Sequence, residues 1–214
     1  MISYKHSFIF IHIYKVAGTS IRKALRKYAY PNILKRYTNY VVSRISERLD
    51  KEIPYPFYPQ INLPPHITAR ELQEELPKNI FDSFLKFAFV RNPWDWQVSS
   101  YFFMQQKPSH YQHEIIKEMS FDEFIEWRVN EDLKLQKRFV VNNKGELIID
   151  FIGKFDNLSN DFQTICERIG INASLPYENR SAHRSYQGYY NGKTKNLIAK
   201  YYQEDIEFFE FTFD

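Results

Sequence analysis

Two short apolar runs, each followed directly by a tight loop and a helix-forming segment, constrain the fold of this chain more than any other feature. The first run is 7–13, SFIFIHI, and the second is 86–90, KFAFV. Short runs of this kind are typical of strands covered on both faces. Strands that alternate with helices predict an α/β fold with a central, mostly parallel sheet. Such sheets bind ligands at the carboxyl ends of their strands.

The helices are predicted from apolar spacing and from residues that cap or end a helix. Thr19 or Ser20 is expected to cap the first helix, and Gly170 to end the helix over 157–169. An Asn-Asn-Lys-Gly turn predicts a hairpin between 138–141 and 146–152. Further helices are expected over 69–76, about 96–104, after the capping box at Ser120, and over about 194–209.

The composition indicates one globular domain over residues 1–214, with a variable region at about 28–65. Hydrophobic residues make up 43% of the chain and charged residues 26%, which excludes a disordered protein. The segment 54–65 holds five prolines and is expected to be an ordered, extended loop.

The compartment is inferred from what the sequence lacks. No apolar run approaches the roughly 18 residues of a membrane-spanning helix, and the N-terminus has no signal-peptide cleavage site. The single cysteine, Cys166, excludes an intramolecular disulfide and a metal cluster built from cysteines. We therefore expect a cytoplasmic protein that does not span a membrane, while peripheral membrane contact stays open.

Positive charge is concentrated near the two ends of the chain. The net charge is only +3, but residues 1–60 carry eleven Lys and Arg against three Asp and Glu, and residues 180–203 carry five basic and no acidic residues. This pattern favours an anionic ligand held between the two ends. A solvated basic face is the alternative. Nucleic acid is not expected, because the overall charge is far from that of strongly basic binding domains.

The loop after the first strand has the residues of an anion-binding site. In FIHIYKVAGTS, Lys15 offers a charge and Gly18 allows close backbone approach, while Thr19 and Ser20 offer hydroxyls at the start of a helix. The pattern is not a Walker A loop, because the lysine precedes the glycine. An ordinary strand–helix turn is the alternative.

The second unit, FAFVRNPWDWQVSSY, offers a comparable site. Arg91 stands just past the strand, Pro93 begins the turn, and Asp95 is expected to cap the next helix. Ser99 lies about one turn into that helix, so an arginine fork and a hydroxyl form a second phosphate clamp. The alternative is a structural ion pair between Arg91 and Asp95. Two such units in one sheet point to a ligand with two separated phosphates.

These motifs resemble those of the sulfotransferases that use 3′-phosphoadenosine 5′-phosphosulfate (PAPS). YKVAGTS is similar to their 5′-phosphosulfate loop, P-K-[TV]-[AG]-G-T-S, and RNPWDWQVS to their 3′-phosphate motif, R-x-P-x-x-x-x-x-S. Two further stretches agree with the carbohydrate and bacterial branch of the family. They are PPHITARELQEEL, and FIGKFDNLSNDFQTICERIGI followed by LPYENRSAHRSYQGYY. The likeness spans roughly residues 6 to 211. In two departures, Tyr14 replaces the usual proline and Trp96 stands where many relatives have arginine.

The resemblance implies a P-loop-NTPase-like, three-layer fold that moves a sulfonate from PAPS to a hydroxyl acceptor, a carbohydrate or glycolipid, without a metal. Adenosine 3′,5′-bisphosphate would be released. The implied cofactor-binding residues are Lys15, Ala17, Gly18, Thr19 and Ser20 at the 5′-phosphosulfate, Arg91 and Ser99 at the 3′-phosphate, and Arg180 and Arg184 in a loop that closes over the nucleotide.

Two residues are implied to be catalytic. Lys15 would offset the charge that grows on the bridging oxygen as the sulfur–oxygen bond breaks. His66 matches the histidine of the family's H-x-T-A-R-E stretch and would take the proton of the acceptor. A histidine that caps the helix and shapes the acceptor cleft is the alternative for His66. His12, inside the first strand, is expected to be a satisfied core residue.

Two other functions stay open at this point. A nucleotide kinase would need a Walker lysine and a magnesium-binding carboxylate, and neither is evident in the sequence. A non-catalytic module would bind a nucleotide or polyanion and transfer nothing.

Overall fold

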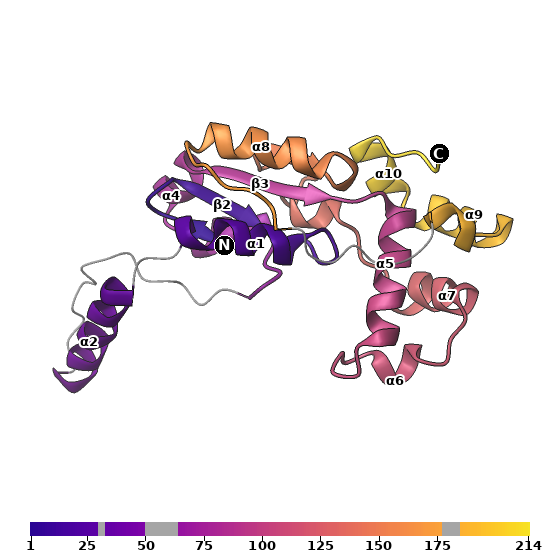
Figure 1. The fold of residues 1–214 in the computed structure, drawn as a ribbon, viewed down its shortest axis with the longest axis horizontal. Helices are drawn as coiled ribbons and strands as arrows, with labels where there is room; N and C mark the ends of the chain where they lie inside the picture. Colours follow the sequence, from indigo (N-terminus) through magenta and orange to yellow (C-terminus); the bar gives the residue numbers. More distant parts are fainter. Residues whose placement is uncertain (30–32, 50–63, 177–184) are drawn as a thin grey trace.

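The sheet is the part of the fold that positions the site. The computed structural model describes residues 1–29, 33–49, 64–176 and 185–214. Within these described ranges, four strands follow one another across the sheet in chain order: β1 (Ile2–Ser3), β2 (Phe8–Ile11), β3 (Leu85–Val90) and β4 (Phe151–Lys154). The strands β2, β3 and β4 are parallel, and β1 is antiparallel to β2. The predicted mostly parallel sheet with flanking helices is confirmed (Figure 1).

The strands form where apolar residues are covered on both faces. All four residues of β2 are buried, as are the last five of β3. Ile11 pairs with Ala88, so β2 and β3 end at the same edge of the sheet. The loop after β2 and the turn after β3 therefore lie side by side, as parallel pairing requires.

The helices lie mostly where apolar spacing placed them. Ser120 caps α7 with the expected capping box, and Gly170, with φ +65°, follows the helix over the predicted amphipathic segment. The helices are α1 (Gly18–Ala29), α2 (Ile33–Leu49), α3 (Ala69–Glu75), α4 (Lys78–Ser83), α5 (Pro93–Gln106), α6 (His113–Ile116), α7 (Phe121–Glu131), α8 (Leu158–Arg168), α9 (Gly192–Tyr201) and α10 (Gln203–Phe209), with short 3-10 turns η1 (Lys137–Phe139), η2 (Phe155–Asn157) and η3 (Tyr186–Tyr189).

Two predicted helix starts were wrong. The helix α1 already begins at Gly18, because the Ala17 carbonyl accepts from the Ile21 N–H at 3.0 Å, so Thr19 and Ser20 lie in the first turn and are not caps. The helix α5 begins at Pro93, where a fixed φ suits the first helical position.

The N-cap of α5 is Asn92, whose side chain accepts from the Trp94 N–H at 3.1 Å. Asp95 is therefore not the cap that the sequence predicted. Its carboxylate instead binds the side chain of Arg91, the residue at the end of β3.

The predicted hairpin forms only next to its turn. A turn forms at 142–145, with Gly145 at φ +79°, but the two arms make one isolated bridge, between Val141 and Leu147. Beyond this bridge the second arm no longer pairs with the first, and Phe151–Lys154 pairs in parallel with β3 instead. The pairing of β4 with β3 covers four positions, whereas the hairpin has a single bridge.

The expected last helix is two helices. Tyr202, which is fully buried, separates α9 from α10 with non-helical backbone angles. The break places Asp205, in the first turn of α10, against the backbone N–H groups of Gln136 and Lys137, both at 2.8 Å.

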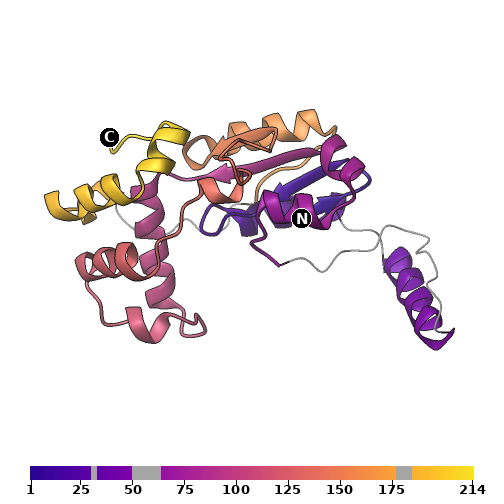
Figure 2. The ribbon, with the colours of Figure 1, turned by 180° about the vertical axis from the view of Figure 1, so that it is seen from behind.

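The helices surround the sheet unevenly. In Figure 1, α8 runs along one side of the sheet, while α5, α6, α7 and α9 form a helical group beyond the end of β3. The helix α2 stands apart from the sheet in both views (Figures 1 and 2). It belongs to the predicted variable region, and most of the proline-rich segment 54–65 lies outside the described residues.

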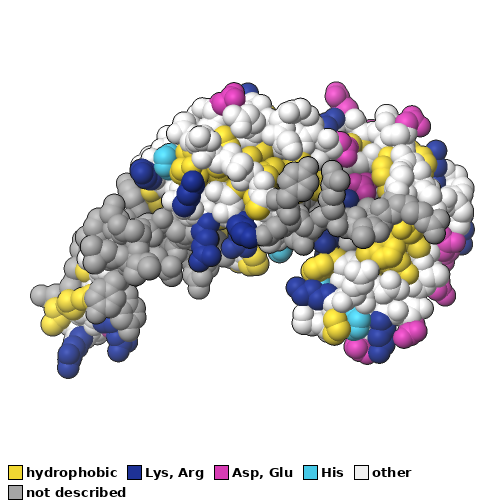
Figure 3. Space-filling view, viewed as in Figure 1, with side chains coloured by type: hydrophobic (Ala, Val, Ile, Leu, Met, Phe, Trp, Pro, Cys, Tyr) yellow, Lys and Arg dark blue, Asp and Glu magenta, His cyan; other side chains and the backbone are white. Residues whose placement is uncertain are grey.

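Much of the N-terminal positive charge lies on an open surface. The outward face of α1 carries four exposed cations, and Figure 3 shows Lys and Arg side chains gathered below the sheet. These cations are Arg22, Lys23, Arg26 and Lys27. They fit the solvated basic face that was the alternative interpretation of the charge. Within the described ranges, no helix is long and apolar enough to cross a membrane.

Candidate functional site

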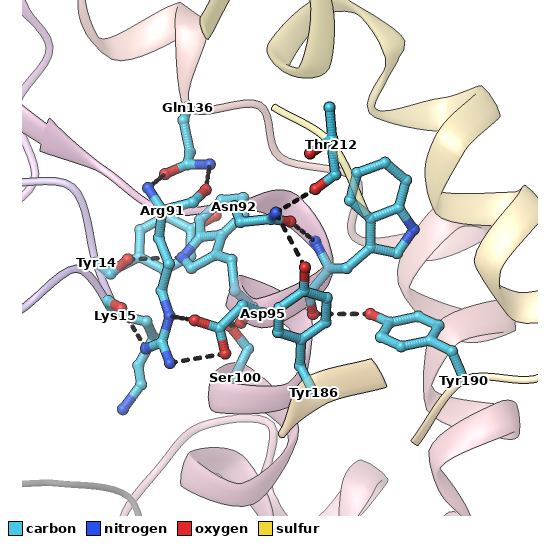
Figure 4. A network of polar contacts seen from close by, with 12 residues as sticks. Tyr14, Lys15, Arg91, Asn92, Asp95, Ser100, Gln136, Tyr186, Tyr190 and Thr212 are labelled. Atoms are coloured by element: carbon cyan, nitrogen blue, oxygen red, sulfur yellow. Dashed lines mark hydrogen bonds and ion pairs between the residues drawn. The ribbon is translucent and has the colours of Figure 1, made fainter. Parts of the chain in front are cut away.

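The two predicted anion-binding units meet at the edge where β2 and β3 end. Figure 4 shows Arg91, at the end of β3, between Lys15 of the first loop and Asp95 of α5. The Nη1 group of Arg91 donates to the Lys15 carbonyl at 3.3 Å. The two units are therefore joined directly, through a side chain of one and the backbone of the other.

The loop after β2 has an unusual backbone. Lys15 has φ +61° and Ala17 has φ +51°, and neither residue is glycine. Non-glycine residues adopt this left-handed region at an energetic cost, and such residues cluster at functional sites. The loop leads into the first turn of α1, whose leading N–H groups have no partner within the helix. A loop of this kind presents backbone N–H groups to an anion.

The ammonium group of Lys15 lies beside this loop in a half-buried position. Its Nζ sits over the ring of Phe103 at 4.0 Å from the ring centre. Burial, with the nearby cations Arg91 and Lys107 acting in the same direction, lowers the pKa of Lys15 from 10.5 to about 8. A bound anion would oppose all three effects, so this lysine gains more from an anionic ligand than a solvated lysine does.

The structure gives Gly18 a packing role in addition to the predicted one, which stays a prediction. A Cβ atom at Gly18 would lie 1.8 Å from Nε2 of His12. The close approach at this glycine is therefore made by the imidazole of His12, the residue that follows β2. Replacing Gly18 would displace that ring whether or not an anion binds nearby.

His12 is not the satisfied core residue that the sequence predicted. Its Nδ1 is buried without a hydrogen-bond partner, and burial, with His66 next, lowers the pKa of the ring to about 3. The ring is therefore neutral at ordinary pH. It packs against the ring of His66 with 4.5 Å between the ring centres.

His66 is exposed, and its orientation is fixed by one hydrogen bond. Its Nδ1 lies 2.9 Å from the carbonyl oxygen of His12. A carbonyl oxygen only accepts, so Nδ1 carries the proton and Nε2 of the neutral ring keeps a free lone pair. The ring also meets the edge of Tyr14 at 5.7 Å between centres. Nε2 is thus arranged as a proton acceptor near the Lys15 loop.

The segment around His66 is held by the helix that follows it. Thr68 caps α3 in a capping box with Glu71, in which each residue's side chain accepts from the other's backbone N–H. His66 itself is not the cap, so the alternative role of a helix-capping histidine is wrong.

Arg91 is buried and already has a carboxylate partner. Its Nε and Nη2 groups donate to the two oxygens of Asp95 at 2.6 and 3.0 Å, and the guanidinium lies 4.0 Å over the ring of Phe155. The alternative interpretation, a structural ion pair, is therefore present in the structure. A guanidinium has five N–H donors. The two hydrogen bonds to Asp95 and the one to the Lys15 carbonyl use three of them. Two donors are left for a phosphate.

The backbone of Arg91 is fixed by Gln136. The side-chain amide of Gln136 accepts from the Arg91 N–H at 2.9 Å and donates to the Arg91 carbonyl at 2.7 Å. Gln136 is fully buried, and its own backbone N–H donates to Asp205. Burial raises the pKa of Asp205 to about 6, against the opposing effect of these hydrogen bonds. Neither residue was identified from the sequence, because nothing local connects 91, 136 and 205.

For the remaining predicted site residues that it describes, the structure gives burial or position but no side-chain hydrogen bond to the rest of the site. Ser99 is buried in the second turn of α5 and makes no hydrogen bond to a described residue. Its membership of the Arg91 clamp stays a prediction. Ser20 is buried and Thr19 exposed in the first turn of α1. Arg180 and Arg184 lie outside the described residues.

The two departures from the sulfotransferase pattern contact each other. The indole Nε1 of Trp96 donates to the Tyr14 carbonyl at 2.8 Å, and the centres of the two rings lie 4.9 Å apart. Among the described residues, no group of three or more His, Cys, Asp or Glu is arranged to hold a metal ion.

Comparisons with known proteins place the chain in a family. A model described as "Sulfotransferase family" matches residues 1–212. An uncharacterized protein of Archaeoglobus fulgidus is 28% identical over 106 residues, which are 49% of this chain and 82% of that protein. The family match covers both anion-binding units, His66 and the sheet that positions them. The chain therefore belongs to the sulfotransferase family.

Proposed function

We propose that this protein transfers a sulfonate group from PAPS to a hydroxyl of a carbohydrate acceptor and releases adenosine 3′,5′-bisphosphate. The observation that supports this most is the contact between the two units, in which Arg91 donates to the carbonyl of Lys15. It brings two separate cationic groups to one edge of the sheet, as a nucleotide with phosphates at both the 5′ and 3′ positions requires. We also propose the P-loop-NTPase-like, three-layer arrangement for the fold.

The residues of the first loop would hold the group that is transferred. The N–H groups at the start of α1, with Thr19 and Ser20, would bind the 5′-phosphosulfate, and Lys15 would offset the charge on the departing oxygen. The fit is supported by the left-handed backbone at Lys15 and Ala17. Arg91, with the two donors it has left, and Ser99 would bind the 3′-phosphate.

His66 would act as the general base. The acceptor oxygen forms a bond to sulfur, the bond from sulfur to the 5′-phosphate oxygen breaks, and its electron pair stays on that oxygen. The hydroxyl proton moves to Nε2 of His66, the nitrogen that keeps its lone pair because Nδ1 donates to the His12 carbonyl. The reaction needs no other group, so the atoms and charges balance without a metal.

The acceptor would bind beside Lys15, along an aromatic wall. The ring of Phe103 contacts the ammonium groups of both Lys15 and Lys107, at 4.0 and 5.0 Å from its centre. Next to it, His110 stacks on Tyr111, which is 75% exposed. Flat exposed rings suit the faces of sugars. Figure 3 shows the surface notched between the sheet and the helical group that carries this wall.

The test is transfer of labelled sulfonate. The protein is incubated with sulfur-labelled PAPS and a panel of sugar and glycolipid hydroxyls, and both labelled product and adenosine 3′,5′-bisphosphate are measured. We expect equal amounts of the two with at least one acceptor. Transfer of phosphate from ATP would instead support the kinase, and binding of the bisphosphate with no turnover on any acceptor would support the non-catalytic module.

A further inference from the structure

Tyr14 and Trp96 are the two positions at which this chain departs from the sulfotransferase motifs, and they are direct neighbours in the fold. Their ring centres are 4.9 Å apart, with 38° between the planes. The hydrogen bond from Trp96 Nε1 to the Tyr14 carbonyl adds a fixed direction to this contact. Two departures in separate motifs that touch each other point to one shared role.

That role is suggested by the backbone between them. The carbonyl of Tyr14 belongs to the peptide that leads into Lys15, the residue with φ +61°. The next carbonyl, of Lys15 itself, accepts from Arg91. Both consecutive carbonyls are therefore held by side chains of the second anion-binding unit.

A proline before the lysine would restrict this loop by itself, because its ring fixes φ. Tyrosine has no such restriction, and the left-handed conformation of the next residue costs energy unless the surroundings enforce it. The indole N–H, which is a donor only, supplies that restraint from outside the loop. Trp96 is fully buried, so it acts through Tyr14 and not on a ligand.

We propose that Tyr14 and Trp96 form a positioning pair that replaces the proline of the common motif and holds Lys15 in its left-handed conformation. The proposal rests on the proposed function for its consequence in catalysis. The same pair supports the other catalytic candidate, because the ring of Tyr14 lies against Trp96 and also against His66, at 5.7 Å between centres. The pair thus connects the lysine and the base.

The chain offers a matched control for the hydrogen bond. Trp94, also buried in α5, donates through its Nε1 to the carbonyl of Lys195 at 3.1 Å, in α9. Trp96→Phe and Trp94→Phe each remove one indole N–H from the same helix. Trp96→Phe removes the donor of the Tyr14 carbonyl, in the loop. Trp94→Phe removes the donor of the Lys195 carbonyl, which is not part of the loop.

The first measurement is binding and turnover. We expect Trp96→Phe to weaken adenosine 3′,5′-bisphosphate binding and to lower kcat/KM by about tenfold, the usual effect of one lost hydrogen bond that positions a charged group. Trp94→Phe should stay within about twofold of wild type in both. Equal effects of the two substitutions would overturn the proposal.

The second measurement does not depend on any nucleotide. The pH dependence of acylation of Lys15, followed by mass spectrometry, reports its pKa, which burial and the cations Arg91 and Lys107 lower to about 8. Release of the loop should solvate the ammonium group, so Trp96→Phe should move the midpoint upward, while Trp94→Phe should leave it in place. An unchanged midpoint in Trp96→Phe would overturn the proposal.

The two measurements separate this proposal from the proposed function. If wild type neither binds the bisphosphate nor uses PAPS, but the acylation midpoint still differs between the two variants, the positioning pair stands and the sulfotransferase function fails. Should Trp96→Phe not fold, benzothienylalanine at position 96 keeps the fused ring without the N–H and gives the same two measurements.

Discussion

The chemistry proposed for this site depends on two side chains, and a main-chain contact restrains each of them. His66 is oriented by the carbonyl of His12, and the backbone of Lys15 is held by Arg91. His12 in turn needs the space that Gly18 leaves open. The arrangement of the catalytic candidates is therefore set by a few close contacts between β2, the first loop and the segment before α3.

Replacing His66 by alanine should separate catalysis from binding. We expect turnover to fall by about 10²-fold or more, because a lost general base typically costs this much, while the affinity for adenosine 3′,5′-bisphosphate stays nearly unchanged. Steady-state kinetics with a good acceptor, together with calorimetric titration of the bisphosphate, measure the two quantities.

His113→Ala is a suitable control for that substitution. The Nδ1 of His113 also contacts a backbone carbonyl, that of Met104 at 3.0 Å, but His113 belongs to α6 and not to the segment before α3. It should keep normal turnover. Near-normal turnover in His66→Ala would place the base elsewhere.

Arg91 is expected to distinguish nucleotides by their 3′-phosphate. Arg91→Ala alone would leave the carboxylate of Asp95 buried without a partner, which destabilises the fold. The double variant Arg91→Ala/Asp95→Ala avoids this. It should bind adenosine 3′,5′-bisphosphate about 10- to 100-fold more weakly, and adenosine 5′-monophosphate almost as well as wild type does. Equal losses for the two nucleotides would mean that Arg91 serves the structure only.

At the scale of the elements, the end of β3 is held by residues that are distant from it in the chain. Gln136 bonds both peptide groups of Arg91, and Asp205 of α10 accepts from the backbone of Gln136 and Lys137. The break between α9 and α10 allows this contact. The C-terminal helices thus stabilise the turn that carries the predicted 3′-phosphate clamp.

This arrangement predicts a pH dependence of stability. The pKa of Asp205 is raised by burial from 3.8 to about 6, so the folded state binds the proton more tightly than the unfolded state does. Stability from this group is present at low pH and is lost as pH rises from about 4 to about 6. The free energies of unfolding of wild type and Asp205→Asn are measured in urea at pH 4 and 7. Relative to the variant, wild type should lose about 2–3 kcal/mol between pH 4 and pH 7. A difference that does not change with pH would contradict the raised pKa.

The local parts of the fold could be predicted from the sequence. The strands at 7–13 and 86–90, the capping box at Ser120 and the stop at Gly170 each depend on residues close together in the chain, and each was confirmed. The hairpin predicted over 138–152 formed only next to its turn, because residues 151–154 pair with β3, a strand some 60 residues earlier in the chain.

The site could be predicted only in part for the same reason. The motifs identified Lys15, His66 and Arg91 as candidates, and the structure brings them to one edge of the sheet. Gln136 has no local signal, because its partner is the backbone of Arg91, 45 positions earlier. The pairing of Arg91 with Asp95 was one of two open alternatives, since the spacing allows both a cap and an ion pair.

At the scale of the whole molecule, the central claim is that one ligand bridges the units that follow β2 and β3. The loop after β2 would bind the 5′ group, and the turn after β3 the 3′-phosphate. The contact between Arg91 and the Lys15 carbonyl joins the two units directly. A ligand with only one of the two groups should therefore gain only part of the available binding energy.

The most direct test is a calorimetric titration of wild-type protein with adenosine 3′,5′-bisphosphate, adenosine 5′-monophosphate, and ATP with magnesium. Each unmade charge-assisted contact costs roughly 1.5–3 kcal/mol, so the bisphosphate should bind at least about tenfold more tightly than either of the other two. Equal affinities for the bisphosphate and the monophosphate, or tighter binding of ATP with magnesium, would contradict the account.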